Sequence, residues 1–315
     1  MKKVGFIDKP FQFEAFIERM AKLDTVVEFA EDTSEQGLIE FCRDKDVLAC
    51  TFTKVSGAVL NATEHCSMII RTGIGVDNID VSAATAKGIK VCFVPDYCRE
   101  EVADHTVTLL LSAIRRVCYV NATTKEHWNM KNYMGYVPRL SRTKAGILSF
   151  GAIGKLIAKR LQGFDIKVMA YDPYLPAEAF ESCGVERAET DKDIFRQCDF
   201  IILTGPLTPE RFHIINDETI AMMVEHPYIV NTARGPLVDE EALIRALRSG
   251  RIAGAGFDVF EHEPITNPEL YTFDNLIISP HMAYYSAESF IDLREKVFDE
   301  IERAIKGEKL RSTVN

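Results

Sequence analysis

Residues 145–172 read AGILSFGAIGKLIAKRLQGFDIKVMAYD, a pattern that predicts a strand, a glycine turn, a helix and a second strand. An apolar run stops at Gly151, apolar residues then recur at spacings of three and four, and a second apolar run ends at Asp172. A strand–helix–strand unit of this length is the building block of a parallel sheet. The stretch therefore predicts an α/β fold, in which ligands bind beyond the carboxyl ends of the strands.

The glycine turn partly matches the G-x-G-x-x-G fingerprint of dinucleotide-binding proteins. Gly151 and Gly154 fill its second and third glycine positions, but Ser149 occupies the first. Asp172 stands where the fingerprint places an acid that accepts hydrogen bonds from the adenosine ribose. Because a carboxylate there repels a 2′-phosphate, NAD is favoured over NADP. Alone, this partial fingerprint is a weak indication, since many α/β proteins that bind no nucleotide have two glycines in such a turn.

Length and composition indicate a globular protein with two domains. The chain has 315 residues, of which 47% are hydrophobic and 27% are charged. A net charge of -10 argues against a nucleic-acid or anionic-membrane partner. No apolar run approaches the roughly 20 residues that span a bilayer, and the first apolar run is too short for an export signal. We therefore expect a cytoplasmic protein. The eight cysteines contain no C-x-x-C pair, so reduced thiols and no metal site are expected.

Strand and helix signals alternate along the chain in two blocks. The first block runs from the apolar stretch at residues 4–7 to that at residues 91–94 and predicts a small doubly wound domain. Residues 96–120 predict one long, mostly buried helix, with acidic residues in its first turn and basic residues in its last. The second block has six strand signals and is expected to form the dinucleotide-binding sheet. The amphipathic helix that follows is expected to return to the first domain.

Charged side chains follow three strand signals of the second block. Arg234 comes after one strand, Asp258 and Glu263 after the next, and His281 directly after the last. Taken singly, such residues are most often surface ion pairs or loop residues. Because the carboxyl ends of parallel strands share one edge of a sheet, we expect these side chains to lie together beside the glycine turn.

Those residue types suit the reduction of a 2-keto acid. The reaction needs a guanidinium for the carboxylate, a hydride donor, and a proton donor at the developing alkoxide. Arg234, NADH and His281 supply these three parts. Glu263 would stabilise the imidazolium, so that a proton is available near neutral pH. Asp258 would bind the nicotinamide carboxamide or tune the local charge.

Four motifs stand in order along the chain: RTGIGVDNID (71–80), VPDYCREEVADHTVTLLLSAIRR (94–116), TARGPLVDEEALIRALRSGRIAGAGFDVFEHEP (232–264) and SPHMA (279–283). Together they resemble the signature of the D-isomer-specific 2-hydroxyacid dehydrogenase family. The match covers most of the chain and is weakest over residues 1–65. The segments PDYCREEVADH and HMAYYSAES look most like the branch that contains the C-terminal-binding-protein corepressors and their bacterial dehydrogenase relatives.

The resemblance implies two doubly wound, Rossmann-like domains with an active-site cleft between them. Residues 1–97 and 284–315 would form a flavodoxin-like substrate domain, and residues 98–283 an NAD-binding domain through which a homodimer usually forms. The resemblance assigns a catalytic triad to Arg234, Glu263 and His281. The implied NAD contacts are Ser149, Phe150, Gly151, Ala152, Ile153, Gly154, Asp172, Gly205, Pro206, Thr208, Thr232, Ala233, Arg234 and Asp258.

The resemblance also implies contacts to the substrate. A backbone loop at Ile74 and Gly75 would bind the substrate carboxylate, and Arg234 and Tyr284 would add side-chain contacts. Arg71 would add a charge there, or would form an ion pair between the domains instead. Substrate specificity would depend further on Thr53 and Tyr97.

Two departures from the family pattern concern the cofactor site. Ser149 replaces the first fingerprint glycine, which bears on cofactor affinity. Thr204 and Gly205 stand where relatives commonly have a bulkier pair, so the nicotinamide end is expected to be shaped differently.

The leading interpretation is an NAD-dependent oxidoreductase that interconverts a small D-2-hydroxy acid and its 2-keto acid. The alternative is a corepressor-like binding protein that senses NAD(H) with little or no turnover, although the chain shows no long disordered tail of the kind that such regulators often have. A phosphorylated substrate would demand basic residues near residues 51–54, where Lys54 is the only one.

Overall fold

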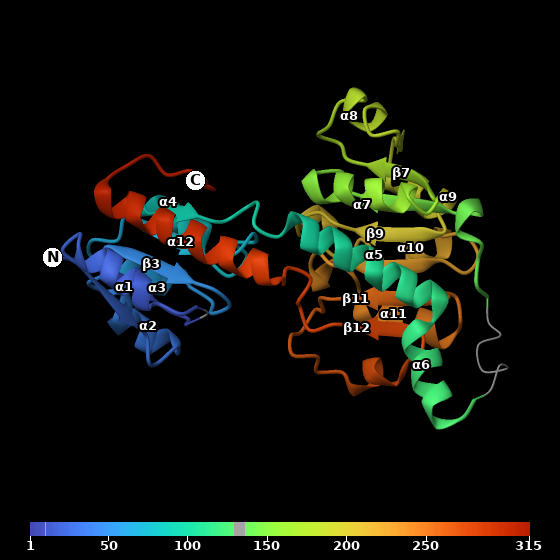
Figure 1. The fold of residues 1–315 in the computed structure, drawn as a ribbon, viewed down its shortest axis with the longest axis horizontal. Helices are drawn as coiled ribbons and strands as arrows, with labels where there is room; N and C mark the ends of the chain where they lie inside the picture. Colours follow the sequence, from blue (N-terminus) through green and yellow to red (C-terminus); the bar gives the residue numbers. More distant parts are fainter. Residues whose placement is uncertain (10, 129–135) are drawn as a thin grey trace. The chain divides into compact units, whose positions relative to one another are not determined.

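The computed structural model describes residues 1–9, 11–128 and 136–315. The chain divides into two compact units, and each is built on a parallel β-sheet with helices packed against it (Figure 1). Unit 1 comprises Met1–Tyr97 and Ser286–Asn315, and unit 2 comprises Cys98–Tyr285. The parallel sheets confirm the α/β fold predicted from the sequence.

Within the described residues, unit 1 contains a five-stranded sheet in the order β2-β1-β3-β4-β5. All four pairings are parallel, and the order is that of flavodoxin-like domains. Strands β3 and β4 are mostly apolar and buried, which suits a sheet covered by helices on both faces. Their bounds are β1 (Lys2–Phe6), β2 (Thr25–Phe29), β3 (Val47–Cys50), β4 (Met68–Arg71) and β5 (Lys90–Cys92).

Two helices from opposite ends of the chain share one face of this sheet. These are α1 (Glu14–Ala21) and α12 (Ala287–Lys306). Phe298 of α12 stacks on Phe16 of α1 with ring centroids 4.1 Å apart, and it meets Phe6 of β1 edge-on. The amphipathic C-terminal helix thus packs on unit 1, as its sequence pattern indicated. The helices that pack on the other face are α2 (Glu35–Cys42), α3 (Gly57–Ala62) and α4 (Val81–Ala86).

Unit 2 contains a parallel sheet in the order β12-β11-β10-β9-β6-β7-β8, seven strands among the described residues. The strand order reverses between β6 and β9, and ligands of such sheets bind beyond the carboxyl ends at this point. The sequence predicted six strands and missed β8, because two exposed charged residues give no apolar signal. The bounds are β6 (Lys144–Leu148), β7 (Lys167–Tyr171), β8 (Glu186–Arg187), β9 (Phe200–Leu203), β10 (Tyr228–Asn231), β11 (Gly254–Phe257) and β12 (Leu276–Ile278).

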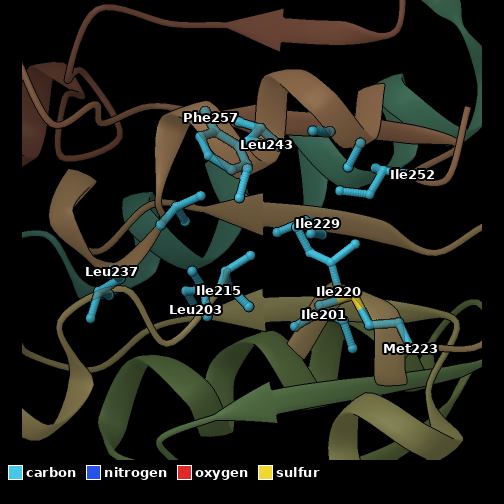
Figure 2. Packing of buried hydrophobic residues seen from close by; sticks show 14 of the residues in the cluster. Ile201, Leu203, Ile215, Ile220, Met223, Ile229, Leu237, Leu243, Ile252 and Phe257 are labelled. Atoms are coloured by element: carbon cyan, nitrogen blue, oxygen red, sulfur yellow. The ribbon is translucent and has the colours of Figure 1, made fainter. Parts of the chain in front are cut away.

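Apolar layers bury both faces of the second sheet. Figure 2 shows one layer, in which Ile201 of β9 and Ile229 of β10 lie close to Ile220 of α10. The helices of this layer are α9 (Asp191–Gln197), α10 (Asp217–Met222) and α11 (Glu240–Arg248). The opposite layer contains α5 (Arg99–Arg115), α7 (Ala152–Gln162) and α8 (Glu178–Glu181).

The prediction of a single helix over residues 96–120 is wrong. Helix α5 ends at Arg115, Arg116 takes a left-handed φ of 51°, and α6 (Val117–Glu126) begins at the next residue. No sequence pattern signals this break, because left-handed positions are usually glycine or asparagine. Arg116 instead places its guanidinium 4.4 Å from the ring centre of Tyr119.

No helix in the described part of the chain is both long enough and apolar enough to cross a bilayer.

Candidate functional site

The glycine turn joins β6 to α7 at the point where the strand order reverses. Ser149 takes a φ of 84°, in the left-handed region that glycine adopts at least cost. Its amide donates a hydrogen bond to the Tyr171 carbonyl at 2.8 Å, and its carbonyl accepts one from the Thr204 hydroxyl at 2.7 Å. The first fingerprint position therefore does require a left-handed backbone, and both neighbouring strands hold the serine in it.

The two remaining glycines differ in what a side chain would contact. A Cβ at Gly154 would lie 2.7 Å from the Ser149 carbonyl oxygen, so only glycine lets α7 approach the turn this closely. A Cβ at Gly151 would meet nothing within 4 Å. Gly151 is the N-cap of α7 and provides no side-chain hydrogen bond, so no capping side chain occupies the first N–H groups of the helix. This arrangement fits the pyrophosphate of a dinucleotide, with Ala152 and Ile153 in the first turn of the helix.

The Asp172 carboxylate lies against the same turn. One oxygen accepts a hydrogen bond from the Phe150 amide at 2.9 Å, and the other accepts one from the Tyr174 amide at 3.0 Å. Each carboxylate oxygen has a second lone pair, so ribose hydroxyls can still donate to it. The predicted contact between Asp172 and ribose is compatible with this geometry and stays a prediction.

The segment after β9 lies directly beside the turn. Thr208 is the N-cap of a short 3-10 helix, η3 (Pro209–Arg211). A Cβ at Gly205 would lie 1.8 Å from Nη1 of Arg211 and 2.1 Å from Oγ of Ser149. The predicted contacts at Gly205, Pro206 and Thr208 thus belong to the same neighbourhood as Ser149. Arg211 was not among the residues that sequence reasoning selected.

The loop after β10 presents Arg234. Asn231, fully buried at the end of the strand, accepts a hydrogen bond from the Ala233 amide at 3.0 Å and donates one to the Arg234 carbonyl at 2.9 Å. The Thr232 hydroxyl lies 2.6 Å from that of Thr106 in α5. Asn231 therefore fixes the backbone from which Arg234 projects. Sequence reasoning gave it no role, although a polar residue that ends a buried strand is a usable signal.

His281 and Glu263 form a hydrogen-bonded pair. His281 Nδ1 lies 2.6 Å from Glu263 Oε2, while Glu263 Oε1 accepts the Phe260 amide at 3.0 Å. Although burial opposes the shift, the hydrogen bonds from His281 and Phe260 lower the pKa of Glu263. His281 has a left-handed φ of 52°, and its amide donates to the Asp258 carbonyl at 2.8 Å. The ring is thus oriented by a carboxylate, with Nε2 as its other nitrogen.

The loop that contains Arg234 packs on the loop that leads to Glu263. A Cβ at Gly235 would lie only 1.9 Å from the backbone carbon and oxygen of Phe260. Strands β10, β11 and β12 are parallel neighbours, so Arg234, Glu263 and His281 follow the same ends of three adjacent strands. This is the arrangement that the spacing of these residues predicted.

The Asp258 carboxylate is turned toward the His281 loop. It is 1% exposed and accepts the amides of Met282 at 2.9 Å and Ala283 at 2.8 Å, and the Ser279 hydroxyl at 2.6 Å. Despite the opposing effect of burial, hydrogen bonds from His105, Ser279 and the two amides lower the pKa of Asp258. The geometry supports a role in positioning the loop. A direct contact with the nicotinamide carboxamide stays a prediction.

His105 completes this network from α5. Its Nε2 lies 2.9 Å from the Ser279 hydroxyl and 3.5 Å from the Asp258 carboxylate. Sequence reasoning did not select His105, because its partners lie more than one hundred residues away in the chain.

The remaining predicted substrate contacts are divided between the units. Arg71, Ile74 and Gly75 follow β4 in unit 1, where Nη1 of Arg71 donates to the Thr72 carbonyl at 3.3 Å. Tyr284 lies half-buried near the end of unit 2. The roles of these residues toward a substrate stay predictions.

The two specificity candidates, Thr53 and Tyr97, both belong to unit 1. The Thr53 hydroxyl donates to the Asp8 carboxylate at 2.7 Å, and Tyr97 is buried. Their influence on substrate choice likewise stays a prediction.

Comparisons with known proteins show which family this chain resembles. Residues 107–283 match the NAD binding domain of the D-isomer specific 2-hydroxyacid dehydrogenases. The chain is 40% identical over 291 residues to a D-3-phosphoglycerate dehydrogenase of Methanocaldococcus jannaschii, covering 92% of this chain and 55% of that protein. It is 35% identical over 302 residues to a glyoxylate reductase of Thermofilum pendens, covering 93% and 88%. The chain thus spans about half the length of the phosphoglycerate dehydrogenases it matches.

Solved structures resemble the chain over nearly its whole length. A glyoxylate reductase from Paecilomyes thermophila superposes with a TM-score of 0.90 at 29% identity, covering 99% of this chain and 98% of the other. A D-lactate dehydrogenase from Aquifex aeolicus, complexed with NAD and lactic acid, superposes with a TM-score of 0.85 at 28% identity, covering 96% of each chain.

Proposed function

Because this chain belongs to the D-isomer-specific 2-hydroxyacid dehydrogenase family, we propose that it interconverts a small D-2-hydroxy acid and its 2-keto acid with NAD(H) as cofactor. The observation that carries the proposal is the Glu263–His281 pair, with 2.6 Å between Oε2 and Nδ1, following the same ends of the strands as Arg234. Turnover requires an oriented proton donor, whereas NAD(H) sensing alone does not.

The nicotinamide, when bound, supplies the hydride for reduction and takes it up in oxidation. His281 carries the proton: Nδ1 is engaged by Glu263, so Nε2 gives a proton to the alkoxide oxygen in reduction and accepts it in oxidation. Glu263 stays ionised near neutral pH because its pKa is lowered, and it holds the ring in one orientation.

Arg234 takes the remaining role in the proposal. Its planar guanidinium offers two parallel N–H donors to a carboxylate and leaves the 2-keto group beside the proton donor. Nη1 already donates to the Ala233 carbonyl at 2.6 Å, which fixes one edge of the guanidinium. The buried Asn231 keeps the backbone of this loop in place.

The choice of substrate is open to a direct test. Purified protein would be assayed for NADH oxidation with glyoxylate, hydroxypyruvate, pyruvate and the phosphorylated form of hydroxypyruvate. We expect turnover of a short unphosphorylated keto acid, since Lys54 is the only basic residue at positions 51–54. Preference for the phosphorylated acid would indicate instead a substrate like that of the phosphoglycerate dehydrogenases.

A His281→Gln variant serves as the control for this assay. It removes the proton donor and should lower kcat at least a hundredfold, roughly the contribution of one general acid, while NADH binding remains. Tight NADH binding without turnover of any keto acid by the parent protein would favour the corepressor-like alternative, a sensor of NAD(H).

We also propose that the protein acts in the cytoplasm as a homodimer that assembles through unit 2. Helix α6 has no buried residue; Val117 at its start is 53% exposed, and Trp128, which follows its end, is 80% exposed. Exposed apolar side chains at both ends of one helix suit a protein interface. Sedimentation of the purified chain as a monomer at assay concentration would contradict the dimer.

A further inference from the structure

The guanidinium of Arg211 lies against the glycine turn, and among the described residues it donates only to uncharged oxygens. Nη1 donates to the Ser149 hydroxyl at 2.7 Å and to the Pro206 carbonyl at 3.3 Å. Nη2 lies 3.5 Å from the Leu148 carbonyl. In the part of the chain that the structure describes, Arg211 forms no ion pair with a carboxylate.

The charge of Arg211 is therefore only partly offset. Burial lowers its pKa, while the carboxylates of Asp172 and Asp191 oppose that shift from beyond hydrogen-bonding distance. A guanidinium has five N–H donors, and neutral acceptors do not compensate its charge. A half-buried cation of this kind is suited to receive an anion.

Both departures from the family pattern, Ser149 and Gly205, lie beside the guanidinium of Arg211. Ser149 brings the hydroxyl that orients Nη1. Gly205 leaves the space, because a Cβ there would lie 1.8 Å from that nitrogen and 2.1 Å from the Ser149 hydroxyl oxygen. A residue with a side chain at position 205 would displace both groups. The serine and the glycine are thus two parts of one arrangement that admits the guanidinium.

We infer that Arg211, oriented by Ser149 in the space left by Gly205, is an additional cofactor-binding residue that contributes a full positive charge to the site of the NAD diphosphate. The N-terminus of α7 alone offers only about half an elementary charge to a diphosphate. The guanidinium adds N–H donors with full charge beside it. The inference rests on the proposed use of NAD(H) and names a residue on which cofactor affinity depends.

The test compares ligands that do and do not contain the diphosphate. The dissociation constants of NADH, ADP-ribose and adenosine would be measured for the full chain and for Arg211→Gln. Loss of a charge-assisted hydrogen bond should raise the constants for NADH and ADP-ribose about tenfold or more and leave that for adenosine unchanged. Once NADH is saturating, kcat should stay close to that of the parent.

Two further variants control for shape. Arg211→Lys keeps the positive charge but lacks the paired N–H donors of the guanidinium. Its dissociation constant for NADH should stay within about threefold of that of the parent. Arg245→Gln removes an exposed arginine that pairs with Asp217 at 2.7 Å, and NADH affinity should not change. Folding of each variant would be checked by circular dichroism, and Arg211→Lys keeps the test decisive if the glutamine variant does not fold.

Three results would overturn the inference: equal NADH affinity in Arg211→Gln and parent, equal losses for adenosine and ADP-ribose, or a lysine variant as weak as the glutamine variant. The last two would show that the side chain only supports the shape of the turn. These outcomes can be told apart from a failure of the proposed function. If the parent binds NADH but turns over no keto acid, the enzyme assignment fails while the role of Arg211 can still be measured.

Discussion

Ser149 combines an unfavourable backbone angle with a favourable hydroxyl contact. Its φ of 84° favours glycine, yet the serine hydroxyl accepts a hydrogen bond from Arg211, which glycine cannot do. Ser149→Ala loses the bond and keeps the strain, whereas Ser149→Gly loses the bond and removes the strain. We expect the glycine variant to be more stable than the alanine variant by about 1 kcal/mol. Urea unfolding of both variants measures this difference, and the opposite order would contradict the strained backbone.

Glu263 is expected to act through its charge. Glu263→Gln preserves the shape of the side chain but replaces the carboxylate that orients the ring of His281. We expect kcat for keto-acid reduction to fall by about a hundredfold, with little change in the KM for NADH. Steady-state kinetics would measure both values.

The matched control for Glu263 is Glu269→Gln, which removes the exposed partner of Arg248 in the same unit. Its kcat should equal that of the parent. Equal rates in Glu263→Gln and the control would remove Glu263 from the proposed mechanism.

The loop from Ser279 to Ala283 depends on Asp258 for its conformation. The carboxylate accepts two loop amides and the Ser279 hydroxyl, and it is buried. Asp258→Asn places an amide N–H group among these donors, so unit 2 should lose about 1–3 kcal/mol of unfolding free energy at pH 7.

The sign of the pH dependence follows from the lowered pKa of Asp258. A carboxylate whose pKa is lower in the folded than in the unfolded state stabilises the fold above its ordinary value of 3.8, and this contribution is lost as the pH falls below it. The difference between parent and Asp258→Asn should therefore shrink between pH 5 and pH 3. Urea unfolding at several pH values checks this, and a difference that grows on acidification would contradict it.

Elements that are buried and apolar were predictable in detail. Strands β9 and β10 could be found from the sequence, because every residue in them is buried and nearly all are apolar. Elements set by tertiary contacts were not predictable. Strand β8 is exposed and charged, and at the break between α5 and α6 the left-handed residue is Arg116 rather than a glycine.

The candidate site shows the same division between local and distant information. Arg234, Glu263 and His281 could be selected because each follows a recognisable strand. Asn231, His105 and Arg211 were missed, since their importance lies in hydrogen bonds to residues that the fold brings near. No sequence pattern around Arg211 predicts its contact with Ser149, because Ser149 lies 62 positions earlier in the chain.

Because the chain divides into two units, we expect a substitution in the core of one unit to leave the stability of the other nearly unchanged. Helix α12 comes from the end of the chain but belongs to unit 1, where Phe298 packs among Phe6, Phe11, Phe13 and Phe16. Phe298→Ala leaves a cavity there and should destabilise unit 1 by about 3–5 kcal/mol. Unit 2 has its own apolar layers and should be little affected.

Calorimetry with and without NADH separates the two units, because a ligand raises the melting temperature only of the part that binds it. We expect Phe298→Ala to lower one transition that NADH does not shift, and to leave the NADH-sensitive transition and the affinity for NADH unchanged. Turnover should fall as unit 1 unfolds, since Arg71, Ile74 and Gly75 belong to it. A single transition that moves as a whole, in variant and parent alike, would show instead that the two units unfold as one cooperative body.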